Sequence, residues 1–310
     1  MNMFLVRKIS ARIFSSAAYL TLCVLGWKRK TVEANLDHVS HGNWGKKFDS
    51  RGLYKQMLKN LTRHVGELLF RFETYKNLPE DCKAYPCEKD GEIFELAEGA
   101  GAVIEKMRQG GIFLTAHYGN YEASGAWLCS LGVPLKASFI PLKPEWLNRH
   151  IYNRVRSVKG RPYSLSARSP REFLCQLDGK APDCNGQRQL FCLLADQDSR
   201  ISSASKGIFL GQSAKINPLP DFLLRHRPDT PVFVCWIEEI DENAAGGKKR
   251  RILHGVEANK TDLPQGRGNC QSIVDGPYRQ WLEERIAENP ALWYGWTHRR
   301  FRSIHPEIYR

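Results

Sequence analysis

The chain has 310 residues, of which 42% are hydrophobic and 25% charged, and its formal net charge is +13 with a pI near 9.4. This composition is typical of a globular protein, and the lack of an internal repeat argues against a solenoid. A positive excess of this size favours a polyanionic partner. Because the sequence has no zinc-finger spacing, glycine-aromatic RNP strand or basic zipper, we expect an anionic membrane surface or an acidic carrier protein, and no nucleic acid.

Nine cysteines are dispersed along the chain, and none of them forms a CxxC pair. An odd, scattered set is typical of reduced thiols rather than of a disulfide framework or a zinc site. We therefore predict no structural metal.

Residues 13–27, IFSSAAYLTLCVLGW, are mostly apolar and have basic residues on both sides. A membrane span usually needs about 20 apolar residues. A cleaved signal peptide is the rival interpretation, but no A-x-A-like site follows and the sequence WKRK opposes export. We predict an uncleaved membrane-anchoring helix within residues 1–30, which lies in the membrane interface or forms a short span, with the body of the protein on the cytoplasmic side. An ordinary buried helix is the alternative.

The remaining chain alternates between predicted helices and short apolar strands. Residues 31–52 are polar and predict a connection, and the proline and glycine residues of 77–91 predict a loop. Apolar periodicity and end signals predict helices over 54–72, 92–108, 122–131, 146–158, 170–177, 218–225 and 277–288. Apolar runs predict strands over 112–116, 136–140, 190–195 and 232–237, and residues 243–251 predict a charged hairpin or loop. This order predicts an α/β fold in residues 31–310, with a mixed, largely parallel sheet flanked by helices.

The stretch TAHYGNYE contains a histidine directly after a predicted strand and a glutamate at the start of a predicted helix. Ligands of open α/β sheets bind at the carboxyl ends of strands, where His117 is expected. Gly119 and Asn120 allow a tight turn, and a carboxylate at Glu122 is favoured in the first turn of a helix. We therefore predict that Glu122 accepts a hydrogen bond from one ring nitrogen of His117, so that the other nitrogen can take a proton.

The surrounding sequence limits the chemistry of such a base. It contains no G-x-S-x-G elbow to supply a nucleophile and no H-E-x-x-H pair to bind a metal. A base without a protein nucleophile indicates direct transfer, in which a hydroxyl of one substrate is activated to attack another. A structural histidine near a carboxylate is the alternative.

Five segments in the same order resemble the lipid A biosynthesis (lauroyl/myristoyl) acyltransferase family, which belongs to the glycerolipid-type acyltransferase superfamily. HYGNYE is similar to the motif of a histidine and an acid separated by four residues. The other segments are NRVRS (153–157), LLADQDS (193–199), IFLGQSA (208–214) and YGWTHRRF (294–301). The resemblance covers roughly residues 90–305. The chain departs from the family pattern in having Tyr121 in place of tryptophan, Ala195 in place of proline and Trp293 in place of glutamine.

This resemblance implies an O-acyltransferase domain over residues 31–310, which moves an acyl chain from acyl carrier protein to a hydroxyl of a membrane glycolipid, a lipid A precursor. It implies that His117 is the general base and Glu122 its orienting partner. Arg154 and Asp196 match positions important to the family's site, and Gly119 and Asn120 complete the expected substrate-binding set. The resemblance implies no metal or redox cofactor, and it implies a location at the cytoplasmic face of the inner membrane.

Two other functions fit the same sequence. One is an acyltransferase of the superfamily that acts on another membrane lipid, such as a phosphoinositol mannoside or an amino-acid lipid. The other is a non-catalytic protein that binds anionic membranes or nucleic acid through its charge alone.

Weaker candidates are also present in these segments. Arg156 and Asp198 are possible site residues, whereas Gly211 is expected to serve a turn. We expect His298 to be structural and Trp293 to pack in the core or at the membrane interface.

Overall fold

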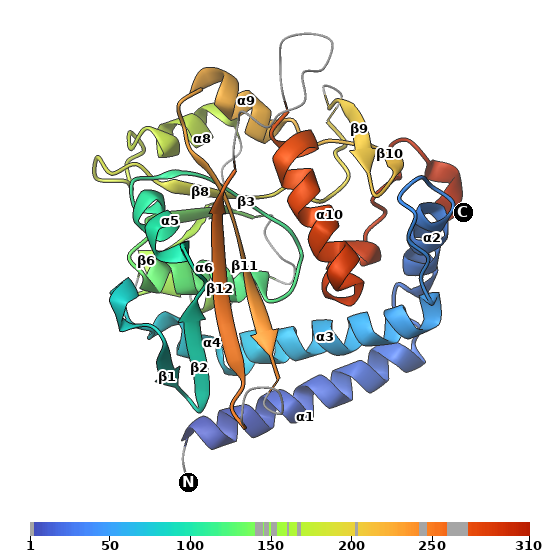
Figure 1. The fold of residues 1–310 in the computed structure, drawn as a ribbon, viewed down its shortest axis with the longest axis horizontal. Coiled ribbons are helices and arrows are strands. Elements are labelled where there is room, and N and C mark those ends of the chain that lie inside the picture. Colours follow the sequence, from blue (N-terminus) through green and yellow to red (C-terminus); the bar gives the residue numbers. More distant parts are fainter. Residues whose placement is uncertain are drawn as a thin grey trace.

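A computed structural model describes residues 3–139, 145, 149, 154–159, 161–165, 169–201, 204–241, 247–258 and 272–310. A twisted sheet with the strand order β1-β2-β12-β11-β3-β8-β4-β7 forms its centre (Figure 1). Its strands are β1 (Cys87–Lys89), β2 (Glu92–Leu96), β3 (Gly111–Thr115), β4 (Leu135–Ser138), β7 (Ser164–Leu165), β8 (Leu190–Leu194), β11 (Val232–Ile240) and β12 (Arg250–Glu257). Two small hairpins pair β5 (Ser157–Val158) with β6 (Arg161–Pro162), and β9 (Lys206–Phe209) with β10 (Gln212–Lys215).

Most neighbouring strands of the central sheet are parallel. The parallel pairs are β2 with β12, β11 with β3, β3 with β8, β8 with β4, and β4 with β7. Only the β11–β12 hairpin and the β1–β2 pair are antiparallel among these strands. The mixed, largely parallel sheet predicted from the sequence is therefore confirmed, and an apolar strand such as β3 is buried throughout because both of its faces are covered.

Helices cover both faces of the sheet. They are α1 (Met3–Val24), α2 (Arg29–Ser40), α3 (Ser50–Phe70), α4 (Phe72–Lys76), α5 (Ala100–Met107), α6 (Tyr121–Ser130), α8 (Pro170–Leu177), α9 (Leu219–His226) and α10 (Arg279–Glu288). Alternate residues of β3 belong to two separate cores. Ile112 and Leu114 pack in the core that contains residues of α2, α3 and α10, whereas Phe113 packs in the core that contains residues of α5 and α6.

The N-terminal helix α1 lies along α3 at the base of the molecule (Figure 1). Within the described residues no single helix is long and apolar enough to span a membrane, although residues 5–24 and Arg29–Ser40 together meet that length and composition, with a bend of 76° between them. Part of α1 packs against the protein, since Ala11 is buried and the Ser15 hydroxyl donates to the Thr62 carbonyl oxygen at 3.0 Å. The opposite side of α1 is exposed and apolar, with Ile13 65% and Leu20 62% accessible.

The structure differs from the sequence predictions in several elements. Residues 31–40 of the predicted connection 31–52 belong to helix α2, because Val32, Leu36 and Val39 are spaced to bury one face. Residues 92–108 form strand β2, a turn and the shorter helix α5, with Gly99 in the left-handed region (φ +76°) just before the helix. Strand β12 was not predicted, because two of its buried positions are occupied by Arg251 and Gly255, so that no apolar period marks it. Most of the predicted helix 146–158 lies outside the described residues.

Candidate active site

The site is formed where two neighbouring parallel strands end. Thr115 at the end of β3 pairs with Leu194 at the end of β8, and each strand is followed by one residue and then by a polar residue. These polar residues are His117 and Asp196. The parallel register therefore brings together two side chains that are 79 residues apart in the sequence.

Asp196 orients the imidazole of His117. The Nδ1 atom of His117 lies 2.9 Å from Oδ1 of Asp196, and Oδ2 accepts from the His117 amide at 3.1 Å and from Trp293 Nε1 at 2.9 Å. Because an ionised carboxylate only accepts hydrogen bonds, Nδ1 carries the proton and Nε2 is left as an acceptor. The nearest described side-chain partner of Nε2 is Nε2 of Gln197, 3.4 Å away.

The electrostatics of the pair follow from this geometry. Burial opposes ionisation of Asp196, but the charge and hydrogen bond of His117 and the bond from Trp293 outweigh it and lower the pKa of Asp196 to about 2. Burial by itself also disfavours the charged imidazole, yet the charge and hydrogen bond of Asp196 raise the net pKa of His117 above 6.5. An imidazole held in this way can exchange a proton through Nε2.

Glu122 does not orient His117, so this prediction is wrong. Glu122 lies in the first turn of α6 and forms a two-pronged ion pair with Arg156, whose Nε is 3.1 Å from Oε2. Its charge contributes to the pKa of His117 only from a distance. The carboxylate that contacts the histidine comes from the next strand instead of the next helix.

The predicted substrate-binding residues have different positions. Arg154 is exposed, and no described contact connects its side chain with His117. Arg156 pairs with Glu122, and the charges of both residues affect the pKa of His117. Asp196, predicted as substrate-binding, is buried behind His117 and holds it.

Gly119 and Asn120 are used by the fold. The Gly119 amide donates to the Leu292 carbonyl oxygen at 2.9 Å, with a positive φ of +56°, so it is not available to a substrate oxyanion. Asn120 is buried, and its Nδ2 donates to Glu67 Oε2 at 2.8 Å. Both residues position the turn that carries His117.

The C-terminal segment completes the site. The Tyr294 amide donates to the His117 carbonyl oxygen at 2.7 Å, and the fully buried Trp293 contacts Asp196. The His298 ring lies 5.5 Å from the His117 ring, centre to centre, and burial together with the charge of His117 lowers the pKa of His298. The expectation that Trp293 packs in the core is confirmed, whereas the proximity of His298 to His117 was not predicted, because no local pattern connects residues 117 and 298.

The weaker candidates have structural contacts. Asp198 accepts from the amide and hydroxyl of Ser303, at 3.1 and 2.7 Å. Gly211 has a φ of +72° in the β9–β10 turn, as predicted.

The described side chains include no group of three or more potential metal ligands. A scan of protein-family models finds none that matches this chain, and a search of curated proteins finds no significant match. The arrangement itself is that of an α/β protein with a histidine–aspartate pair at the carboxyl edge of its sheet.

Proposed function

We propose that this protein is an O-acyltransferase that moves a fatty acyl chain from acyl carrier protein to a hydroxyl of a membrane glycolipid, a lipid A precursor. One observation carries the proposal: Asp196 holds His117 with Nδ1 protonated and Nε2 open to a substrate proton. A general base of this kind is what direct transfer to a hydroxyl requires. The five sequence segments that resemble the family support the choice of substrates.

The proposed reaction uses His117 twice. Nε2 takes the proton of the acceptor hydroxyl while that oxygen bonds to the thioester carbonyl carbon. The carbon–sulfur bond then breaks, and the leaving thiolate takes the proton back from Nε2. The ionised Asp196 stabilises the imidazolium that exists between the two steps.

The oxyanion of the tetrahedral intermediate needs hydrogen-bond donors. The Gly119 amide is already engaged, so we assign this role to the N-terminal end of α6, which starts at Tyr121. The first amides of a helix lack intrahelical acceptors, and the helix dipole favours a negative charge there.

The proposed location is the cytoplasmic face of the inner membrane. The exposed apolar residues of α1 and the net charge of +13 support contact with an anionic bilayer. The same two observations also favour a second candidate function, a non-catalytic protein that binds anionic membranes.

An activity assay separates these functions. Purified protein is mixed with acyl-acyl carrier protein and membrane lipid extract, and acylated products are identified by mass spectrometry. We expect His117→Ala to abolish transfer and His41→Ala, at an exposed histidine, to leave it unchanged. Equal transfer by His117→Ala and wild type would refute the catalytic role, and no transfer by wild type would favour the membrane-binding function.

A further inference from the structure

A cavity of about 910 Å³ lies between α1, the C-terminal half of α3 and the end of the β11–β12 hairpin. The side chains that give it charge come from all three elements and from the start of β2. Six are cationic and three are anionic: Lys8, Arg12, Lys59, Arg63, Arg71 and Lys249, against Glu67, Glu92 and Asp241. The cavity therefore has an excess of three positive charges.

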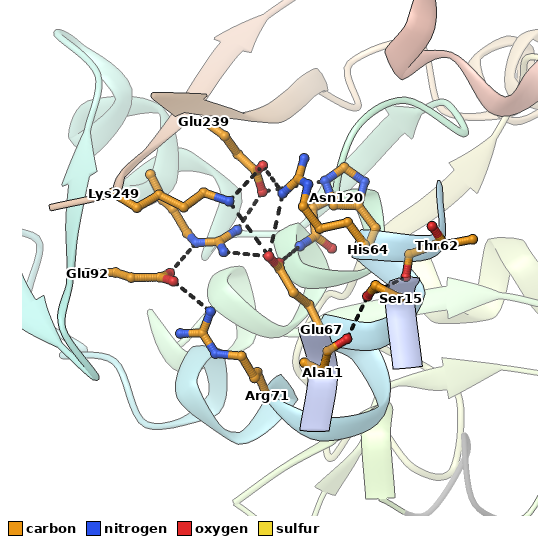
Figure 2. Close-up of polar contacts among 12 residues, drawn as sticks. Ala11, Ser15, Thr62, His64, Glu67, Arg71, Glu92, Asn120, Glu239 and Lys249 are labelled. Carbon is orange, nitrogen blue, oxygen red and sulfur yellow. Dashed lines mark hydrogen bonds and ion pairs between the residues drawn. The ribbon is translucent and has the colours of Figure 1, made fainter. Parts of the chain in front are cut away.

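The carboxylates at the inner end of the cavity already have cationic partners. Glu67 accepts from Arg251 at 2.8 Å, and Glu92 accepts from Arg71 and Arg251 at 2.6 Å each (Figure 2). Lys249 lies 3.1 Å from the third buried carboxylate of this cluster, Glu239. Arg63 also pairs with Glu239. Four cations therefore surround these three carboxylates, so the buried cluster is positive by one charge and neutralises its own acids without help from the outer wall.

The outer wall of the cavity is cationic. Arg12 projects from α1 and Lys59 from α3, both are exposed, and neither has a carboxylate within ion-pair distance among the described residues. A group that enters between them meets charge that the protein itself does not balance. Such a setting favours an anion, and a phosphate offers several strong acceptor oxygens to arginine and lysine.

The exposed apolar side of α1 runs next to this wall. Leu5, Ile9, Ile13, Leu20 and Val24 recur at helical spacing, and each is 47% or more exposed. Leu20 also lines the cavity. An amphiphile could thus place a charged group in the cavity and its hydrocarbon along α1.

We propose that this cavity binds the phosphate-bearing headgroup of an anionic membrane lipid, whose acyl chains lie against the exposed apolar side of α1. The site is separate from the proposed reaction centre, because neither His117 nor Asp196 lines it. Lipid binding here does not require acyl transfer.

The cavity is nevertheless connected by a hydrogen bond to the turn that carries His117. Glu67 lines the cavity and accepts from Asn120, three residues after His117. A lipid bound at the cavity would therefore hold α1 and α3 in place behind the same turn.

Sedimentation with vesicles tests the proposal on the full chain. Vesicles of phosphatidylcholine with or without phosphatidylglycerol are titrated with wild type, with Arg12→Gln/Lys59→Gln, and with Lys28→Gln/Lys30→Gln. The last variant removes the same charge from exposed residues that do not line the cavity. We expect the cavity variant to lose about 10-fold more affinity for anionic vesicles than this control, because it loses specific phosphate contacts in addition to surface attraction.

Two further arms identify the ligand. Ile13→Ser/Leu20→Ser should weaken binding to the same vesicles, and soluble glycerol 3-phosphate should bind at least about 100-fold more weakly than the lipid because it lacks buried chains. His117→Ala should bind vesicles as wild type does, so the result is independent of the acyltransferase proposal. The proposal would be overturned if Arg12→Gln/Lys59→Gln and Lys28→Gln/Lys30→Gln lost the same affinity for anionic vesicles. It would also be overturned if glycerol 3-phosphate bound as tightly as the lipid.

Discussion

Replacing Asp196 by asparagine tests the reasoning about the site most directly. The pKa of this carboxyl falls from its ordinary value of 3.8 to about 2. Since one pKa unit corresponds to about 1.4 kcal/mol, ionised Asp196 contributes about 2.5 kcal/mol to the free energy of unfolding. We expect Asp196→Asn to lose about this amount near pH 6, although the amide can keep part of the hydrogen bonding.

The pKa shifts of Asp196 and His117 determine how the stability lost in Asp196→Asn changes with pH. Asp196 has a lowered pKa, so its contribution is present above pH 4 and is lost as the pH falls towards 2. His117 has a raised pKa, so its contribution is present below pH 6.5 and is lost as the pH rises through the folded-state pKa. The stability advantage of wild type over Asp196→Asn should therefore be largest between about pH 4 and 6.5.

Urea unfolding followed by tryptophan fluorescence measures the stability, and NMR titration of labelled histidine measures the pKa of His117. In Asp196→Asn that pKa should fall, because burial is then opposed only by more distant charges. Glu122→Gln is the matched control, since Glu122 contacts Arg156 and not the imidazole. A larger fall of the His117 pKa in Glu122→Gln than in Asp196→Asn would refute the assignment of the orienting carboxylate.

Three further predictions follow from contacts of the same structure. Trp293→Phe removes one donor to Asp196 and should raise the pKa of that carboxyl and lower the free energy of unfolding by about 1–3 kcal/mol, measured by urea titration. Acyl transfer should increase with pH through the raised pKa of His117, so a kcat/KM profile with its acid limb below pH 6 would contradict the base assignment. Gly66→Ala places a β-carbon 2.3 Å from Ser15 Oγ and 2.9 Å from the Ala11 carbonyl oxygen, where α1 packs against α3. It should destabilise the protein by about 1–3 kcal/mol and expose α1 to trypsin, and unchanged digestion would show that α1 does not depend on this close contact with α3.

The sequence was sufficient to predict the class of the fold and the position of His117. Short apolar runs predicted strands β3, β4, β8 and β11, and a histidine directly after the predicted strand 112–116 had to lie at the carboxyl edge of the sheet. The predicted partner was wrong because spacing along the chain describes only local neighbours. Which strand lies next to β3 is decided by the packing of the whole sheet, and that choice brings Asp196, not Glu122, to the imidazole.

Charged residues in buried places explain the other differences. Strand β12 contains Arg251, which is 1% exposed and contacts three glutamates, so its sequence looks like a solvent-exposed loop. Glu92 explains why β2 was predicted as helix. A glutamate at the start of a segment is typical of the first turn of a helix, but Glu92 is buried in a strand. Such residues follow no hydrophobic period, and only their partners show why they can be buried.

The contact between the His117 turn and the C-terminal segment has a consequence for biosynthesis. His117 and Asp196 leave the ribosome long before Leu292, Trp293 and Tyr294, whose carbonyl, indole and amide groups, respectively, hold the turn and the carboxylate. α1, in contrast, emerges before either residue of the pair. The histidine–aspartate pair is therefore fixed in its final geometry only after residues 292–294 have been synthesised and have packed against it.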